Sequence, residues 1–199
     1  MGDNRIDSDG LGSLLYRDRA GEQRSPLANF VAPVTITVSN SAFADGGPMP
    51  PSNAGKGVGD NISPPLHWTG LPPDTKQVAL IIDDIDVPLP RPLMHTIAVI
   101  EPDVDGVAEG ALRPGSAGMR FIPGAFGHLG YAGPRPIRGH GPHHYRFHVF
   151  ALDVSIPDHV TTARALWDRI AGHALARGVL TGTYQRTTSS VMPRWRSND

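Results

Sequence analysis

Glycine and proline constrain this chain more than any other feature, because 23 glycines and 20 prolines are spread through 199 residues without a period. Both residue types interrupt regular structure and favour turns. Such a composition argues against long helices and favours many short strands joined by loops. With 39% hydrophobic residues, a chain of this length can bury the core of one domain of ordinary size. The sequence therefore predicts a mainly β fold.

Charge, cysteine content and hydropathy exclude several classes of protein. A formal net charge of −1 provides no basic surface for nucleic acid, and no apolar run is long enough to span a membrane. With no cysteine in the chain, disulfides, thiol nucleophiles and cysteine-based metal sites are excluded. The first residues, "MGDNRIDSDG", lack the basic and apolar regions of a secretory signal. We therefore expect a cytoplasmic protein.

The chain divides into a polar N-terminal extension, residues 1–30, and a β-sandwich domain, residues 31–199. A short helix is expected in the extension around 11–17. Patterns of alternating or continuous apolar residues predict strands in the domain, and these lie at 34–43, 78–82, 95–100, 144–154 and 179–186. The run 78–82 is apolar throughout, which is typical of a strand that is covered on both faces.

One main helix is predicted near 161–177, as an accessory to the sheets. Its apolar residues recur at spacings of three and four, and they are Leu166, Trp167, Ile170, Ala174 and Leu175. Thr161, Thr162 or Asp158 can cap its start, and Gly178 stands where a left-handed residue would end it.

Strand geometry decides which polar side chains can meet, because residues i and i+2 share a face. If "DDID" is extended, Asp84 and Asp86 point together and Asp83 points the other way. On the later strand, His143 and Tyr145 share one face. The opposite face carries His144, Arg146 and His148. His140 can reach the same pocket from the preceding loop, and His95 can contribute from its own strand.

These residues could form several kinds of site. A zinc site is disfavoured because the chain has no H-E-x-x-H and no H-x-H on a strand, so we predict no metal and no cofactor. The G-x-S-x-G elbow of a serine hydrolase and a glycine-rich phosphate loop are also missing. Each acid or histidine by itself could be a turn residue or a solvated loop residue. Their joint position at strand–loop junctions favours a functional site.

Several ordered motifs resemble the phosphatidylethanolamine-binding protein family, in its bacterial Raf-kinase-inhibitor-like branch. The family's Asp-Pro-Asp-Ala-Pro signature is similar to "DIDVP" (84–88), and a histidine opens the next strand in "MHTIAVI" (94–100). The family's Gly-x-His-Arg-Tyr segment is similar to the end of "GYAGPRPIRGHGPHHYRF" (130–147). Supporting matches are "NISPPLHWTGLPPDTK" (61–76) and "LTGTYQR" (180–186). Departures are Ile85 for proline, Val87 for alanine and His144 for arginine.

The resemblance implies two antiparallel sheets packed face to face, with a small anion-binding pocket at one end. Transferred motif by motif, the ligand-binding residues are Asp84, Asp86, His95, Gly133, Pro136, His143 and Tyr145. The two carboxylates would orient His95 and His143 and raise the pKa of each imidazole. Backbone N–H groups around Gly133 and the Tyr145 hydroxyl would be further donors.

We therefore predict a protein that binds a small phosphate- or carboxylate-bearing ligand, and binds phosphate groups more strongly below about pH 6.5. Regulation of a kinase or protease partner is a further expectation from the resemblance, and a homodimer is left open. The alternative is a hydrolase or metal-assisted enzyme that uses the Asp/His pocket. No activated nucleophile is visible, which favours a binding protein over an enzyme.

Overall fold

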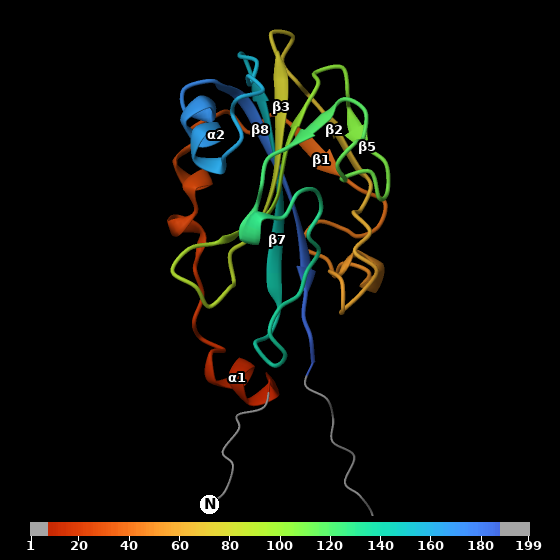
Figure 1. Ribbon diagram of the computed structural model, residues 1–199, viewed down its shortest axis with the longest axis vertical. Coiled ribbons are helices and arrows are strands. Elements are labelled where there is room, and N and C mark those ends of the chain that lie inside the picture. The colour runs from red at the N-terminus through yellow and green to blue at the C-terminus, as the bar shows by residue number, and fades with distance from the viewer. Residues whose placement is uncertain (1–7, 188–199) are drawn as a thin grey trace, which may run out of the picture.

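The computed structural model describes residues 8–187, and these form two antiparallel sheets (Figure 1). The smaller sheet has the order β1 (Thr37–Ser39), β2 (Leu66–Thr69), β5 (Gly106–Val107). The larger sheet has the order β6 (Met119–Phe121), β4 (Leu93–Ile100), β3 (Gln77–Asp84), β7 (His143–Leu152), β8 (Ala174–Tyr184). The predicted mainly β, two-sheet antiparallel sandwich is confirmed.

The larger sheet is buried on both faces by alternate residues of its central strands. Val78, Leu80 and Ile82 of β3 face the smaller sheet, together with Phe147 and Val149 of β7. The intervening residues face outward into a second apolar cluster, which includes Ala79, Ile81, Phe150, Leu166 and Ile170. Because both faces are covered, β3 reads as a continuous apolar run, as the sequence predicted.

The predicted main helix is only partly correct. Helix α2 spans Ala163–Ile170, with the Thr162 side chain accepting a hydrogen bond from the Ala165 N–H at its start. The chain turns at Gly172, whose φ is +81°, and β8 begins at Ala174. Residues 174–178 are therefore strand. Gly178 does not end a helix; it lets the residue before β1 approach, since a Cβ there would lie 2.3 Å from the Ile36 carbonyl oxygen.

The N-terminal segment packs along the outside of the sandwich, at the left of Figure 1. It contains α1 (Ser8–Leu14), close to the predicted helix, and the short 3₁₀ helices η1 (Glu22–Arg24) and η2 (Pro26–Asn29). Leu27 and Phe30 are buried in the outer apolar cluster. The packing therefore continues across residue 30, where we placed the end of the extension.

Two further 3₁₀ turns lie in the loops, η3 (Pro51–Asn53) and η4 (Ala125–Gly127). None of the helices in residues 8–187 has the length and apolar character needed to cross a bilayer.

Candidate functional site

Two adjoining cavities lie where β3, β4 and β7 meet the loop 125–137. The first, which we call the Asp84 cavity, has a volume of about 400 Å³, and its polar lining includes Asp84, His95, Arg135, His143 and Tyr145. The second, the Lys56 cavity, measures about 380 Å³ and is lined by Lys56, Asn61, His95, His128, Gly133 and Arg135 among others. The two cavities share Leu93, His95, Phe126 and Arg135. They are therefore two parts of one cleft.

Strand register places three lining residues of the Asp84 cavity side by side. Asp84 of β3 is paired with Leu93 of β4 on one side and with Tyr145 of β7 on the other. Paired residues of antiparallel strands bring their side chains close together on one face. The predicted shared face of His143 and Tyr145 agrees with this arrangement, because both line the same cavity.

His95 reaches the cavity through an irregularity in β4. Ile82 pairs with Thr96, but the next residue, Asp83, pairs with Met94, so His95 is an extra residue in its strand. A β-bulge of this kind redirects side chains. Without it, alternation would place His95 on the outward face, with Ile97 and Val99. With it, His95 lines the cavity together with Leu93. Period-two reasoning alone could not predict this shift.

Asp86 does not line either cavity. Strand β3 ends at Asp84, and the Asp86 N–H donates to Oδ1 of Asp84 over 2.8 Å, which is a turn in which the side chain of Asp bonds two residues ahead. The i, i+2 rule therefore fails at this point. The Asp86 carboxylate instead accepts from the N–H and Nδ1 of His144 and pairs with Arg19.

Gly133 and Pro136 lie in different parts of the cleft. Pro136 lines the Asp84 cavity, whereas Gly133 lines the Lys56 cavity. The Gly133 N–H, which we expected to face the ligand, donates to Oδ1 of Asn61 over 2.9 Å. It is therefore not a free donor. Asn61 was missed as a site residue, although it belongs to the "NISPP" stretch that carries part of the resemblance.

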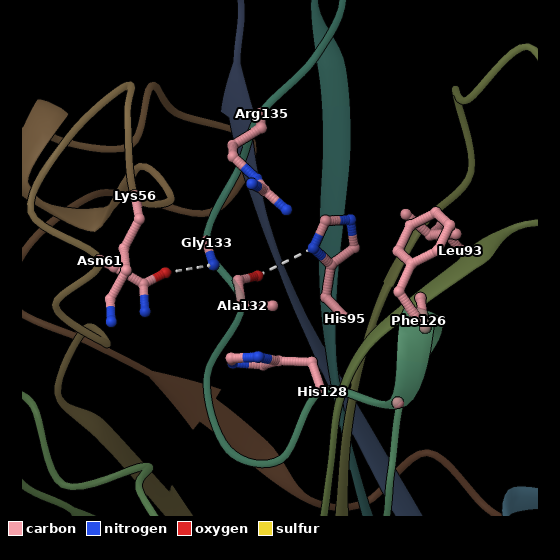
Figure 2. A pocket seen from close by; sticks show the side chains of 11 residues that line it. Lys56, Asn61, Leu93, His95, Phe126, His128, Ala132, Gly133 and Arg135 are labelled. Carbon is pink, nitrogen blue, oxygen red and sulfur yellow. Dashed lines mark hydrogen bonds between the residues drawn. The ribbon is translucent and has the colours of Figure 1, made fainter.

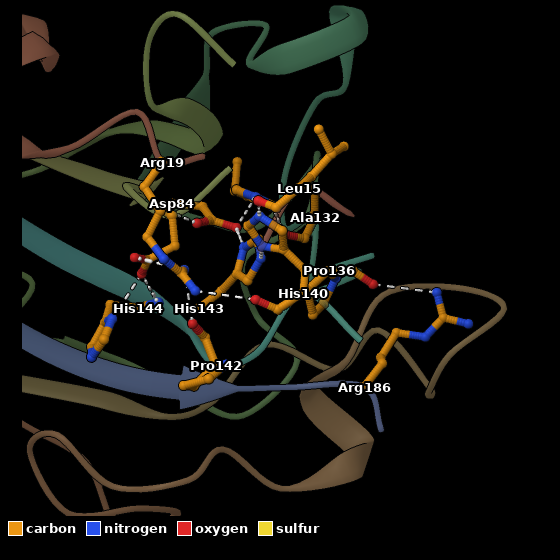
Figure 3. A network of polar contacts seen from close by, with 12 residues as sticks. Leu15, Arg19, Asp84, Ala132, Pro136, His140, Pro142, His143, His144 and Arg186 are labelled. Atoms are coloured by element: carbon orange, nitrogen blue, oxygen red, sulfur yellow. Dashed lines mark hydrogen bonds and ion pairs between the residues drawn. The ribbon is translucent and has the colours of Figure 1, made fainter. Parts of the chain in front are cut away.

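A row of buried hydrogen bonds runs from the Asp84 cavity to the N-terminal segment (Figure 3). Oδ2 of Asp84 lies 2.8 Å from Nδ1 of His143, and Nε2 of His143 lies 2.7 Å from Nδ1 of His140. Nε2 of His140 faces the carbonyl oxygens of Leu15 and Asp18 at 2.8 and 3.1 Å. His140, whose role the sequence left undecided, thus joins His143 to the segment 15–18.

Counting protons along this row fixes its charge. A carbonyl oxygen only accepts, so Nε2 of His140 carries a proton, and one more proton lies between the two rings. A third lies between His143 and Asp84. Without these protons the carboxylate and the two rings would each carry one negative charge, so the three protons balance three charges. The row as a whole is neutral, so it adds no net charge to the cavity.

Two polar atoms on the cavity wall have no partner. Nδ1 of His95 lies 2.8 Å from the Ala132 carbonyl oxygen, to which it must donate (Figure 2). Nε2 of His95 and the hydroxyl of Tyr145 are both buried and have no partner with hydrogen-bond geometry, although Asp84 is close enough to the Tyr145 hydroxyl to help raise its pKa. The two rings contact each other edge to face, with centroids 5.2 Å apart. Buried polar atoms are usually hydrogen-bonded, so these two atoms mark the place where a ligand would bond.

The pKa of His95 differs from our expectation. Burial lowers it below the ordinary value, and the attraction of Asp84, whose Oδ2 lies 4.0 Å from Nε2, does not reverse that effect. His95 is therefore neutral at neutral pH, with a lone pair on Nε2. Burial, and secondarily the charge of Asp84, raises the pKa of the Tyr145 hydroxyl, which keeps its proton.

The residues on the opposite face of the sheet form a separate network. Asp83 points away from the cavity, as predicted, and accepts hydrogen bonds from Arg146, His148 and Ser25. Burial alone would raise the pKa of Asp83, but the bonds from His148 and Arg146 outweigh it and lower the pKa to about 2. Among the described residues, no three His, Asp or Glu side chains converge to hold a metal ion.

The fold and the cavity define an antiparallel β-sandwich protein with a cleft at one end of its larger sheet, in which a few polar side chains lie among apolar ones. Within that class, the chain belongs to the phosphatidylethanolamine-binding protein family, whose sequence model matches residues 39–185. The resemblance inferred from the motifs is confirmed.

Relatives and solved structures agree with this assignment and support the bacterial-type branch of the family. A UPF0098 protein of Pyrococcus horikoshii is 36% identical over 152 residues, which cover 74% of this chain and 75% of the relative. Escherichia coli YbcL, described as a member of the mammalian PEBP family, superimposes with a TM-score of 0.69 at 28% identity, covering 76% of this chain and 99% of YbcL. A PEBP homologue from Chlamydia trachomatis gives 0.68 at 31% identity, covering 76% and 98%.

Proposed function

We propose that the protein binds a small phosphate- or carboxylate-bearing ligand in the Asp84 cavity. The observation that carries this proposal is the pair of unpartnered buried atoms, Nε2 of His95 and the hydroxyl of Tyr145. A ligand that bonds to both would remove the cost of leaving two polar groups without partners, which is about 1–3 kcal/mol for each group.

The protonation of these atoms indicates what the ligand offers. Neutral His95 presents a lone pair and therefore needs a donor, whereas the Tyr145 hydroxyl can donate to an anionic oxygen. A phosphate ester that carries one proton supplies both, through its P–OH group and its charged oxygens. Because the Asp84–His143–His140 row is neutral, the cation that faces the anion is Arg135, which lines the same cavity.

Titration of matched esters between pH 5 and 8 tests this proposal. Ethyl phosphate has a second pKa of about 6, so its affinity should fall as pH rises and its proton is lost. Ethyl sulfate carries no proton in this range, so its binding should be weak and constant. Amide and side-chain NMR shifts of the cleft residues report both affinities.

Two results would contradict the proposal. If ethyl sulfate binding also strengthens as pH falls, charging of His95 rather than the ligand proton controls binding, as we first expected from the sequence. If neither ester gives saturable shifts at the cleft residues, the protein is not an anion-binding protein of this kind.

The hydrolase alternative finds less support in the geometry. His143 could act as a general base only through a free ring nitrogen, but both of its nitrogens are hydrogen-bonded, one to Asp84 and one to His140. Tyr145 is a poor nucleophile because its pKa is raised. The arrangement is therefore better suited to holding a ligand than to cleaving it.

The wider role stays a prediction. We expect control of a kinase or protease partner and a cytoplasmic location, and self-association stays open. One mycobacterial relative is named as a lipoprotein, LppC.

A further inference from the structure

The Lys56 cavity differs from the Asp84 cavity in its charge. Its lining includes two cationic side chains, Lys56 and Arg135, and no carboxylate. The Asp84 cavity contains Asp84 as well as Arg135. The Lys56 cavity is thus the more electropositive part of the cleft, although the proposed function does not use Lys56.

Both cationic side chains are unpartnered. Within residues 8–187, neither Lys56 nor Arg135 forms an ion pair or a side-chain hydrogen bond, and both residues are exposed at the cavity wall. Figure 2 shows the guanidinium of Arg135 directed toward the His95 ring. A positive charge that faces a cavity without a counter-ion attracts an anionic group from solution.

The two loops that carry these cations are fixed to each other. The Gly55 N–H donates to the Pro134 carbonyl over 2.9 Å, and Asn61 bonds the Gly133 N–H. The stem of Arg135 packs tightly on Gly55, since a Cβ there would lie 2.8 Å from Cγ of Arg135. Arg135 is exposed, but this packing restricts the stem of its side chain, which lowers part of the cost of ordering it when a ligand binds.

We infer that the Lys56 cavity is a second anion subsite, and that the ligand carries two anionic groups a few bonds apart, such as a phosphate ester that also bears a carboxylate. One group bonds to Tyr145 and His95, the other faces Lys56, and Arg135, which lines both cavities, can face either group. His95 and Arg135 line both cavities, so one molecule can occupy both. This inference rests on the proposed function for the first group only.

A pair of ligands that differ in one carboxylate tests the subsite. Phosphoglycolate is ethyl phosphate with a carboxylate in place of the methyl group. We expect the protein to bind phosphoglycolate about tenfold more tightly than ethyl phosphate, because the carboxylate adds one charged contact. In the double variant K56Q/R135Q the ratio of the two dissociation constants should approach one.

The control is K76Q, which removes one positive charge at the exposed residue that precedes β3, at the end of that strand far from Asp84. K76Q should leave the ratio of the two dissociation constants as in the original protein, because Lys76 can act on the ligands only through the net charge of the protein. Equal affinity for the two ligands in the original protein, or a ratio unchanged in K56Q/R135Q, would overturn the inference.

NMR shifts separate this inference from the proposed function. If ethyl phosphate gives no saturable shifts but phosphoglycolate moves Asn61 and Gly133, the Lys56 cavity binds anions and the proposed role of Tyr145 and His95 is wrong. If neither ligand produces saturable shifts, both proposals fail.

Discussion

Two buried tyrosines lie near the cleft, and their hydroxyl groups have different roles. The Tyr131 hydroxyl donates to the Asn53 carbonyl over 2.9 Å, whereas the Tyr145 hydroxyl has no partner in the protein. Both side chains are almost fully buried, at 4% and 1% exposed. Removing each hydroxyl in turn therefore distinguishes a hydrogen bond that stabilises the fold from one that we assign to a ligand.

We predict that Y145F weakens binding of ethyl phosphate by roughly ten- to a hundredfold, the effect of one hydrogen bond to a charged group, without loss of stability. Y131F should instead lower the free energy of unfolding by about 1–3 kcal/mol, because it leaves a buried carbonyl without its donor, and should retain binding. NMR titration and urea unfolding measure the two quantities. A Y145F variant that binds like the original protein would show that this hydroxyl does not contact the ligand.

For single residues, the sequence predicted the direction of the side chain correctly where the residue lies in a regular strand. His143 and Tyr145 share a face, and Asp83 points away from Asp84, because β3 and β7 are regular at these residues. Asp86 was placed wrongly because its own N–H bonds the Asp84 side chain and turns the chain. The bulge at His95 and the pairing of His140 with His143 depend on contacts between distant segments, which spacing along the chain does not reveal.

Among the elements, the segment from α1 to η2 was the least anticipated. Arg19 fastens it to the cleft side of the sandwich, pairing with Asp86 at 2.9 Å and donating to the carbonyls of His140 and Pro142. The N–H groups of Ala20 and Gly21 add backbone bonds to Val87 and Ile85. This segment also supplies the carbonyls that end the Asp84–His143–His140 row.

We predict that R19Q lowers the local stability of this segment by about 1–2 kcal/mol, so that it opens more often. The backbone amides of Asp18, Ala20 and Gly21 should then exchange with solvent roughly tenfold faster. The control is R164Q, since Arg164 pairs with Asp168 on the exposed surface of α2, where an ion pair contributes about 0.3–0.5 kcal/mol. Equal exchange in R19Q and R164Q would show that Arg19 does not fasten the segment.

The helix predicted near 161–177 is shorter than expected because strand pairing outweighs the local helical pattern in its second half. Ala174 and Leu175 fit the helical spacing, but their segment pairs with β7 along most of its length, from Leu152 to His143. Backbone bonds to a neighbouring strand outweigh a preference of a few tenths of a kcal/mol per residue. The helix ends at Ile170 and the chain turns at Gly172. The sequence contains both Gly172 and Gly178, and the apolar pattern alone did not show which of them follows the helix.

At the scale of the whole molecule, one buried carboxylate joins three parts of the fold. Asp83 of β3 is fully buried and accepts bonds from Arg146 and His148 of β7 and from Ser25 of the N-terminal segment. Arg146 also pairs with Glu22 of η1. Protonation of Asp83 therefore weakens contacts that hold the segment, β3 and β7 together.

The direction of the pH dependence follows from the pKa of Asp83, which falls from 3.8 to about 2 on folding. A group whose pKa is lower in the folded state adds stability above its unfolded pKa, and that stability is lost as the pH falls through the folded value. We predict that the free energy of unfolding decreases by about 2 kcal/mol through Asp83 between pH 5 and 2.

Urea unfolding at several pH values measures this decrease, and D83N should remove the part that Asp83 contributes. D83N also removes the anionic partner of His148 and one of the two anionic partners of Arg146, so the slope of stability against pH is compared rather than stability itself. D158N serves as the control, because the side chain of Asp158 is fully exposed and its removal should keep the slope. An unchanged slope in D83N would mean that other carboxylates control the loss of stability in acid.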